Sequence, residues 1–267
     1  MDSARSKKQL IHKSLLKWFG IFLVATAFNS CKKDKPKEDT NIPPVATGAF
    51  NLLFKNTVGD SALVLETSEY KNANGDTFTI STFNYYISNV KLIADDNSVY
   101  TESESYHLLS AFNDNTLKIP LKNVPFKKYI SISFMIGVDS VKNVTGIQGG
   151  DLDPAKGMFW NWNTGYIMAK FEGYSSKSPE VDKTVLYHVG GFSGSNSVLK
   201  TVGLDFPTAM TVSETESPKL KVKADVLEWF TSPQNISFSS LYVIHAPGAD
   251  AKKMADNFAD MFSIITN

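Results

Sequence analysis

The chain has 267 residues, of which 42% are hydrophobic and 12% aromatic, so it has ample material for a buried core. It carries 27 basic and 27 acidic residues, and this neutral balance argues against a nucleic-acid partner, whose binding domains are strongly basic. With one cysteine, the chain can form no internal disulfide and no thiolate metal cluster.

The N-terminal segment has the layout of a bacterial lipoprotein signal. Lysines precede an apolar run that ends at Phe28, and Asn29-Ser30 leads into Cys31. The alternative is a short transmembrane anchor, but the apolar run falls short of the roughly 20 residues that a spanning helix needs. We therefore expect residues 1–30 to be a signal peptide that is removed. The Cys31 thiol would then carry a lipid that anchors the protein in the cell envelope, periplasmic or outer membrane.

The chain that follows the signal divides into a tether and a domain. Without residues 1–30 it has 22 basic and 26 acidic residues, a net charge of −4. Residues 31–47 are charged and contain several prolines, with too little apolar surface to offset the entropy of ordering. We expect them to form a lipidated flexible tether, and residues 48–267 to form one domain.

Most of this domain has the two-residue periodicity of half-buried strands. Residues 82–93 read as a long aromatic-rich strand, and residues 130–136 place apolar side chains at every even position. In residues 219–226, apolar side chains at even positions alternate with three lysines and an aspartate. Polar turn clusters such as residues 72–76 and 95–97 separate the runs. The pattern predicts an all-β domain, an antiparallel β-sandwich or a barrel-like sheet.

One short helix is predicted near the C-terminus, at about residues 250–263. Pro247-Gly248 closes the preceding strand, and Asp250 can cap the first turn. Apolar residues then recur at helical spacing and indicate packing against the core: Ala251, Met254, Ala255, Phe258, Met261 and Phe262.

Three histidines remain once the signal, which holds His12, has been removed. His188 shares a strand face with Leu186 and Gly190, and His245 stands at a strand end just before the predicted helix. His107 lies between Tyr106 and Leu108 and is the weaker candidate. Each can be read either as a metal ligand or as a hydrogen-bonded histidine of the core.

Other candidate residues lie between positions 137 and 166. Trp160 and Trp162 follow a loop rich in glycine and aspartate, and alternation would place both indoles on one face as an aromatic ladder. Asp139, Asp151 and Asp153 could supply oxygen ligands to calcium, although Asp-x-Asp before proline is also common in plain turns. No acid–base pair, nucleophile motif or phosphate-binding loop is present, so we expect no catalytic activity.

These segments, taken together, resemble the MbnP-type periplasmic copper-binding proteins, which are named for a member associated with the copper-chelating peptide methanobactin. The resemblance covers roughly residues 48–265 and is carried by a collinear series: Phe83-Asn84-Tyr85-Tyr86-Ile87-Ser88-Asn89-Val90, Gly137-Val138-Asp139, Met158-Phe159-Trp160-Asn161-Trp162, Gly165-Tyr166, Lys170-Phe171-Glu172-Gly173, His188-Val189-Gly190-Gly191, His245 and Ala255-Asp256-Asn257.

The resemblance implies a particular chemistry. In such proteins a dihaem partner of the cytochrome c peroxidase type (MbnH- or MauG-like) oxidises a tryptophan to kynurenine. That product, with histidines, holds copper. Carried over to this chain, the metal residues would be His188, His245 and Trp160 or Trp162. The chain departs from one distant relative in having Trp162 where that relative has a ligand histidine. The alternative function is a scaffold or binding lipoprotein whose aromatic groove takes a glycan or a protein.

Overall fold

The structure of the protein is a computed structural model that describes residues 45–163 and 165–266. The expected signal peptide, Cys31 and nearly all of the expected tether lie outside the described residues. The domain therefore begins, in structural terms, where the chain enters its first strand at Thr47.

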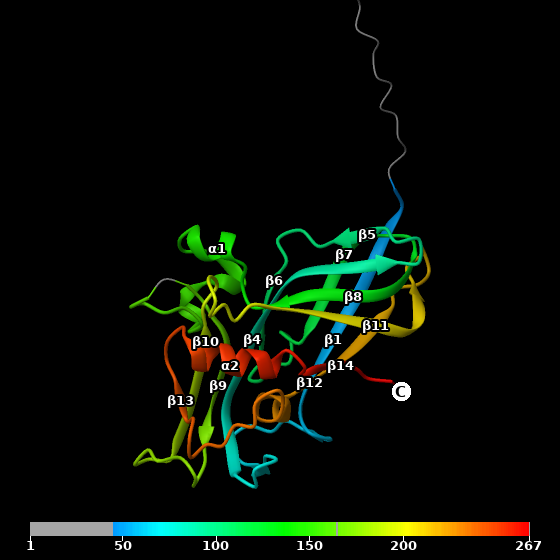
Figure 1. Cartoon of the computed structure of the whole chain (residues 1–267). Helices are drawn as coiled ribbons and strands as arrows, with labels where there is room; N and C mark the ends of the chain where they lie inside the picture. The colour runs from blue at the N-terminus through cyan, green and yellow to red at the C-terminus, as the bar shows by residue number, and fades with distance from the viewer. Residues whose placement is uncertain (1–44, 164, 267) are drawn as a thin grey trace, which may run out of the picture. The chain divides into compact units, whose positions relative to one another are not determined.

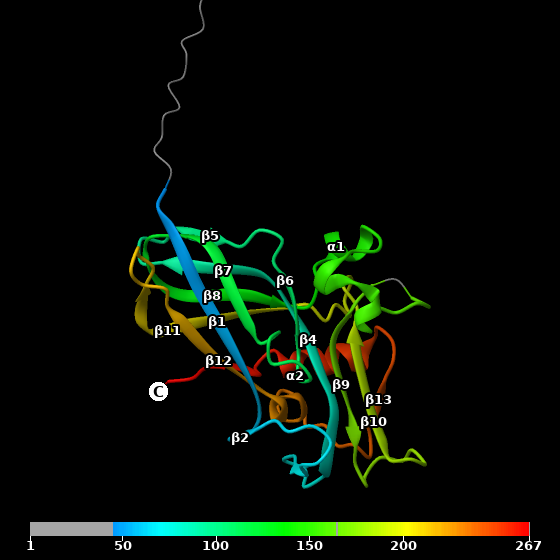
Figure 2. The same cartoon turned by 180° about the vertical axis from the view of Figure 1, so that it is seen from behind.

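Within the described residues the strands form two sheets (Figures 1 and 2). The smaller sheet has the order β14-β12-β1-β2, with β7 also paired to β1. Its strands are β1 (Thr47–Val58), β2 (Ser61–Ala62), β7 (Lys118–Pro125), β12 (Lys219–Asp225) and β14 (Phe262–Ile264). The sheets do not close into a barrel, so of the two architectures predicted from the sequence the sandwich is the one that forms.

The larger sheet has the order β11-β8-β4-β9-β10-β13, and three short strands also pair with β4. Its main strands are β4 (Thr77–Ala94), β8 (Lys128–Ile136), β9 (Ile167–Tyr174), β10 (Thr184–Gly190), β11 (Lys200–Thr211) and β13 (Val243–Ile244). The short strands are β3 (Tyr70–Lys71), β5 (Val99–Thr101) and β6 (Tyr106–Ser110). The predicted strand at 82–93 is thus the middle of β4, which links both halves of the sheet.

The core fills the space between the inner faces of the two sheets. Phe134 on β8 packs edge-on against Phe54 on β1 and Phe262 on β14, with ring centroids 6.2 and 5.0 Å apart. Tyr85 on β4 is fully buried, and its hydroxyl donates to Oδ1 of Asn56 on β1 at 2.9 Å. Aromatic rings that meet edge to face stabilise the core beyond the area they bury. The side chains on the inner faces are therefore occupied by core packing, and side chains on the outer faces are the ones available to bind a ligand.

The alternation read from the sequence holds in one strand and breaks in another. In β12 the side chains of Leu220, Val222 and Ala224 are buried, as predicted. In β8, by contrast, Ile130 is 39% exposed and Tyr129 is buried, because the register with β4 shifts between Ser131 and Tyr129. A bulge adds one residue, and side chains beyond it change faces. Two strand pairs, β1 with β12 and β10 with β13, are parallel rather than antiparallel.

The C-terminal helix α2 (Ala249–Phe258) is present but ends five residues earlier than predicted. Met254 and Phe258 are fully buried, and the Phe258 ring lies 5.1 Å from that of Trp229 in the short 3₁₀ helix η3 (Val226–Phe230). Met261 and Phe262 are buried too, but as a turn and a strand, because Phe262 pairs with Ala224 at the edge of β12. The backbone N–H and C=O groups at the edge of β12 need hydrogen-bond partners, and β14 supplies them. The helix therefore ends before these residues, although their apolar side chains continue the helical spacing.

A second helix, α1 (Ser140–Val144), was not predicted from the sequence. The Asp139 side chain caps it by accepting the backbone N–H of Lys142 at 3.1 Å. The buried Asn143 side chain donates to the carbonyl oxygen of Val138 at 2.5 Å. Two 3₁₀ turns, η1 (Gly150–Leu152) and η2 (Pro154–Lys156), follow it. Within the part of the chain that the structure describes, no helix has the length and apolar character needed to cross a membrane.

Candidate functional site

Strand pairing brings the two strongest histidine candidates together on the outer face of the larger sheet. Val185, Tyr187 and Val189 point into the core, so His188, which lies on the opposite face of the strand as predicted, points outward. Strand β13 runs parallel to β10 with Leu186 opposite Val243, and continuing this register places His245 beside His188. The two imidazole rings are nearly perpendicular, at 83°, with centroids 5.4 Å apart.

Glu172 orients His188. It lies on the neighbouring strand β9, and its Oε1 is 2.7 Å from Nε2 of His188, while Thr82 donates to Oε2 at 2.9 Å. Chiefly because His188 hydrogen-bonds to this carboxylate, the pKa of Glu172 falls to about 2. An ionised carboxylate only accepts hydrogen bonds, so Nε2 of His188 carries the proton. Because Nε2 is engaged by the carboxylate, Nδ1 is the nitrogen of His188 that is left for a metal.

His245 is exposed at the end of β13, where the chain turns toward α2. Partial burial and the neighbouring His188 lower its pKa from the ordinary value of 6.5. A lowered pKa favours the neutral ring at pH 7, the form in which imidazole can ligate a metal. The site therefore places two imidazoles at the same edge of the sheet, and the lowered pKa of His245 favours its neutral ring.

Trp160 covers the strand position next to His188. The indole is 5% exposed, and a Cβ on Gly190 would lie 2.5 Å from its Cη2 atom, so glycine is required for the ring to rest there. Gly190 is two residues after His188, and alternate strand residues share one face about 6.6 Å apart. The Trp160 ring therefore lies on the same outer face as the two histidines.

The segment that carries the tryptophans is held over β9 by backbone contacts. The carbonyl oxygen of Met158 accepts from Ile167 at 2.9 Å, and Phe159 forms a bridge with Tyr166. Lys170, which faces His188 across the strand pair, donates to the Gly157 carbonyl oxygen at 3.0 Å. These bonds hold residues 157–159, which precede Trp160, in place against β9. We call the outer face of the larger sheet that carries His188 and His245 the histidine face.

Trp162 differs from Trp160 in its exposure. It is 61% exposed, and its ring lies 5.4 Å from that of Trp160 at a tilt of 42°. The two rings are thus in contact, as the predicted ladder required, although neither residue belongs to a strand. With Phe159 and two asparagines they line an open hollow of about 390 Å³.

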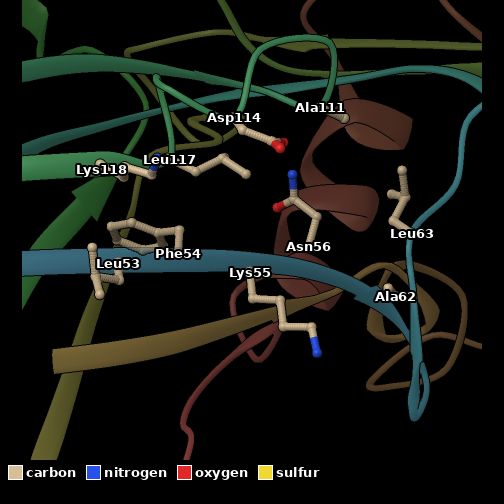
Figure 3. A pocket seen from close by; sticks show the side chains of 10 residues that line it. All are labelled: Leu53, Phe54, Lys55, Asn56, Ala62, Leu63, Ala111, Asp114, Leu117 and Lys118. Atoms are coloured by element: carbon tan, nitrogen blue, oxygen red, sulfur yellow. The ribbon is translucent and has the colours of Figure 1, made fainter.

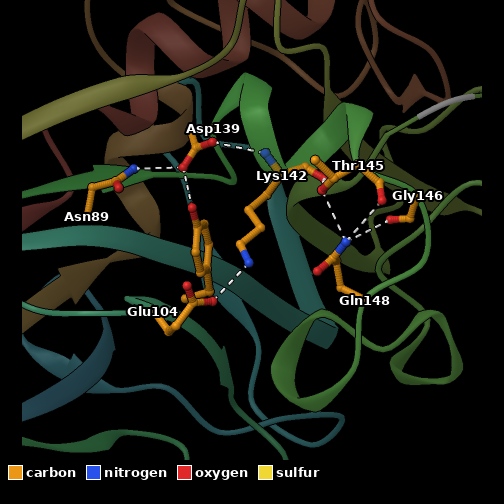
Figure 4. A network of polar contacts seen from close by, with 8 residues as sticks. Asn89, Glu104, Asp139, Lys142, Thr145, Gly146 and Gln148 are labelled. Atoms are coloured by element: carbon orange, nitrogen blue, oxygen red, sulfur yellow. Dashed lines mark hydrogen bonds and ion pairs between the residues drawn. The ribbon is translucent and has the colours of Figure 1, made fainter. Parts of the chain in front are cut away.

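The three aspartates proposed for calcium are bound by protein groups, and Figure 4 shows the contacts of Asp139. Asp139 accepts from Tyr106 at 2.5 Å, from Asn89 at 3.2 Å and from the cap of α1. Asp151 accepts from Lys156 and from the Leu108 backbone, and Asp153 caps η2. Among the described residues, no three His, Cys, Asp or Glu side chains gather in the geometry of a metal site.

His107 belongs to a different cluster from the other two histidines. Its Nε2 lies 2.8 Å from Oε2 of Glu102, which also accepts from the Ser105 hydroxyl at 2.5 Å. Ser105 in turn accepts the Val90 N–H and so fixes the loop before β6. This arrangement matches the hydrogen-bonded reading of that histidine.

Sequence reasoning did not assign a role to Glu172, Lys170 or Thr82. A signal for the first two was present, because Lys170 and Glu172 alternate with the buried Ala169 and Phe171 on a strand that pairs with the histidine strand. Their proximity to His188 depends on register, however, and one sequence does not determine register.

A separate cavity lies between β1, β2 and the loop before β7 (Figure 3). It has a volume of about 460 Å³, and Asn56, Asp114, Leu63 and Leu117 are among the residues that line it. The Nδ2 atom of Asn56 is buried without a hydrogen-bond partner among the described residues. No histidine lines the cavity, so it is separate from the imidazole pair.

Comparison with known proteins identifies the family. The sequence model of the family described as MbnP matches residues 47–246, most of the chain. The chain belongs to the MbnP family. Among solved structures, MbnP from Methylosinus trichosporium is similar with a TM-score of 0.51 and 13% sequence identity, over 70% of this chain and 78% of that one. At this identity the likeness shows the fold alone. The search of curated proteins found no significant match.

Proposed function

We propose that this MbnP-family protein binds copper at the outer face of the larger sheet, through His188 and His245. The observation that carries the proposal is the 5.4 Å separation of the two imidazole rings beside Trp160. Two nitrogens bound to one metal at about 2 Å each lie at most about 4 Å apart. Copper binding in this proposal therefore requires the exposed His245 ring to turn a nitrogen toward His188.

The fit of the residues to copper is good but incomplete in the unmodified chain. Imidazole nitrogens suit copper, and Cu(I) accepts sites with few, soft ligands. His188 presents Nδ1 and His245 presents a neutral ring, so the chain supplies two donors. The indole of Trp160 has no lone pair for ligation. Bound copper would supply a soft, redox-active centre, and Glu172 would hold His188 in place.

The third donor in this proposal is Trp160 after oxidation to kynurenine. Two oxygen atoms, one from each of two peroxide molecules, add across the double bond of the five-membered ring and cleave it to a ketone and an N-formyl group. Water then hydrolyses the N-formyl group, so that one carbon leaves as formate and an aromatic amine remains. The chain has no oxidising group of its own, so the oxidant is a peroxide used by a dihaem partner enzyme. This protein is then a substrate of that enzyme rather than a catalyst itself.

The proposed place of work is the cell envelope. The layout around Cys31 supports export and lipidation, and the resemblance to periplasmic proteins agrees with it. Histidine side chains, and tryptophan only after oxidation to kynurenine, are then the candidates for copper binding, because lipid occupies the thiol.

The proposal is tested by copper titration of the protein isolated from its native host. Cu(I) affinity is measured by competition with a chromophoric chelator for wild type, His188→Ala, His245→Ala and His107→Ala. We expect the first two variants to lose at least about tenfold in affinity and His107→Ala to match wild type. Equal affinities for all four proteins would reject this site.

A further inference from the structure

The outer face of the smaller sheet carries five lysines on three neighbouring strands. Inner positions of β1 are buried at Phe50, Leu52 and Phe54, so odd-numbered positions point outward. The register then sets lysines on both sides of Leu53 and beside Asn51. We call this set the lysine face: Lys55, Lys118, Lys219, Lys221 and Lys223.

The lysine face is a dense patch of like charge. Strands lie about 4.8 Å apart and alternate residues about 6.6 Å, so five ammonium groups occupy an area of roughly 10 by 13 Å. The lysines share the outer face with uncharged residues that pair with them or with their neighbours across β1, β7 and β14: Asn51, Leu53, Pro120 and Ser263. Asp225, 5% exposed at the end of β12, contacts Nζ of Lys223 at 3.2 Å.

This patch is set apart from an acidic remainder. Residues 45–266 contain 18 lysines, no arginine and 23 acidic residues, a net charge of −5. Without the lysine face the same residues would carry a net charge of −10. This separation of charge gives the domain a dipole moment. An anionic surface would therefore attract the lysine face and repel the remaining, acidic surface.

We propose that the lysine face rests on an anionic lipid surface and that the histidine face is thereby directed away from the membrane. The inner faces of β4 and β8 pack on β1, and the inner face of β10 packs on η3, so the lysines and His188 lie on the outer faces of different sheets. Residues 31–46 span at most about 55 Å, and a lipid on Cys31 would keep the domain within reach of the bilayer. Because the lipid already holds the domain near the bilayer, a weak attraction between the lysine face and anionic lipids is enough to orient the domain on the membrane.

The experiment measures vesicle binding by co-sedimentation, with residues 44–267 as the protein. This part forms a compact unit that contains every described strand and the whole core, so it can be produced without the N-terminal segment. Vesicles of phosphatidylcholine are compared with vesicles that also contain phosphatidylglycerol, at low and at high ionic strength. We expect binding to the anionic vesicles alone, and its loss in high salt.

Two triple variants with the same change in net charge identify the surface. Lys55→Glu, Lys118→Glu and Lys219→Glu together should lower affinity at least about 100-fold, since each lysine near an anionic bilayer contributes about fivefold and each glutamate adds repulsion. The control changes three exposed lysines elsewhere, Lys71→Glu, Lys91→Glu and Lys177→Glu, and should lower it by less than about tenfold. If the first triple variant does not fold, Lys55→Gln with Lys219→Gln should lower affinity about 25-fold.

Three outcomes overturn the proposal. The first is a wild-type domain that does not bind anionic vesicles at low salt. The second is an equal loss in both triple variants, which would mean that net charge rather than the lysine face governs binding. The third is tight binding to a soluble polyanion such as heparin without vesicle binding, which would assign the face to a different partner. None of these results depends on copper.

Discussion

Trp160 and Gly190 are in direct contact, and the contact leaves no room for a side chain on the glycine. A Cβ there would lie 2.5 Å from Cη2 and 2.6 Å from Cζ3 of the indole, and 2.8 Å from the carbonyl oxygen of Tyr166. Two of these atoms belong to a rigid ring and one to the backbone, so moving them to make room for a Cβ would disturb the surrounding packing. The packing of the tryptophan beside the histidines thus depends on a hydrogen atom at position 190.

The first prediction follows from this contact. Gly190→Ala should push the Trp160 indole away and destabilise the domain by about 1–3 kcal/mol, the usual cost of overpacking. Urea unfolding measures the stability, and tryptophan fluorescence reports the displaced ring. Gly203→Ala is the matched control, because a Cβ at that strand position meets nothing within 4 Å. A Gly190→Ala protein as stable as the control would show that Trp160 does not rest on β10.

The second prediction concerns the Glu172–His188 pair and pH. The pKa of Glu172 is about 2 in the folded protein against an ordinary value of 4.5, so folding favours the ionised carboxylate. The stabilisation is complete above about pH 4.5 and is lost as the pH falls toward 2. Glu172→Gln should therefore be less stable than wild type at neutral pH, and the difference should shrink steadily below pH 4.5.

Urea unfolding of both proteins between neutral pH and pH 3 checks the second prediction. Glu214→Gln, a change at an exposed loop position, serves as the control. A constant difference between wild type and Glu172→Gln across this range would mean that the carboxylate gains nothing from His188 on folding.

Some of the structure could be predicted from the sequence because local pattern decides it. The alternation in residues 219–225 identified a strand and its buried side correctly, since a two-residue period has one interpretation on a half-buried surface. The placement of His188 on the strand face opposite to Val185, Tyr187 and Val189 followed in the same way. Such inferences need no knowledge of which strands are neighbours.

The rest depended on contacts between distant segments. The bulge that exposes Ile130 arises from pairing with β4, and the early end of α2 arises because Phe262 completes the edge of β12. Glu172 became a candidate only once β9 and β10 were in register. A single sequence carries no direct signal for these pairings. The residues that surround His188 on neighbouring strands, such as Glu172, could therefore not be found from it.

The third prediction concerns the anchor. Cys31 lies outside the described residues, so this prediction rests on the sequence layout. Cys31→Ala should remove the acceptor of the lipid and move the exported protein from the membrane to the soluble fraction on cell fractionation. The lysine face attracts an anionic bilayer only reversibly, so a high-salt wash should release the variant and not the wild type. Identical partitioning of the two proteins after that wash would refute lipidation.

The last prediction separates the two tryptophans. Trp160 is 5% exposed and rests on the histidine strand, whereas Trp162 is 61% exposed and touches the site only through Trp160. We therefore expect Trp160 to be the residue that is oxidised and that completes the copper site. Trp160→Phe and Trp162→Phe keep an aromatic ring at each position and form a matched pair.

Both variants are produced beside their native dihaem partner, and intact mass and Cu(I) affinity are measured. Wild type and Trp162→Phe should gain the mass of two oxygen atoms less one carbon monoxide, together with a near-ultraviolet absorption band that indole lacks. Trp160→Phe should show neither change and should bind copper at least about tenfold more weakly, because it has lost one of three donors. The reverse assignment would move the site to the exposed ring. Unmodified mass in all three proteins, with copper still bound tightly, would show that His188 and His245 need no oxidised tryptophan.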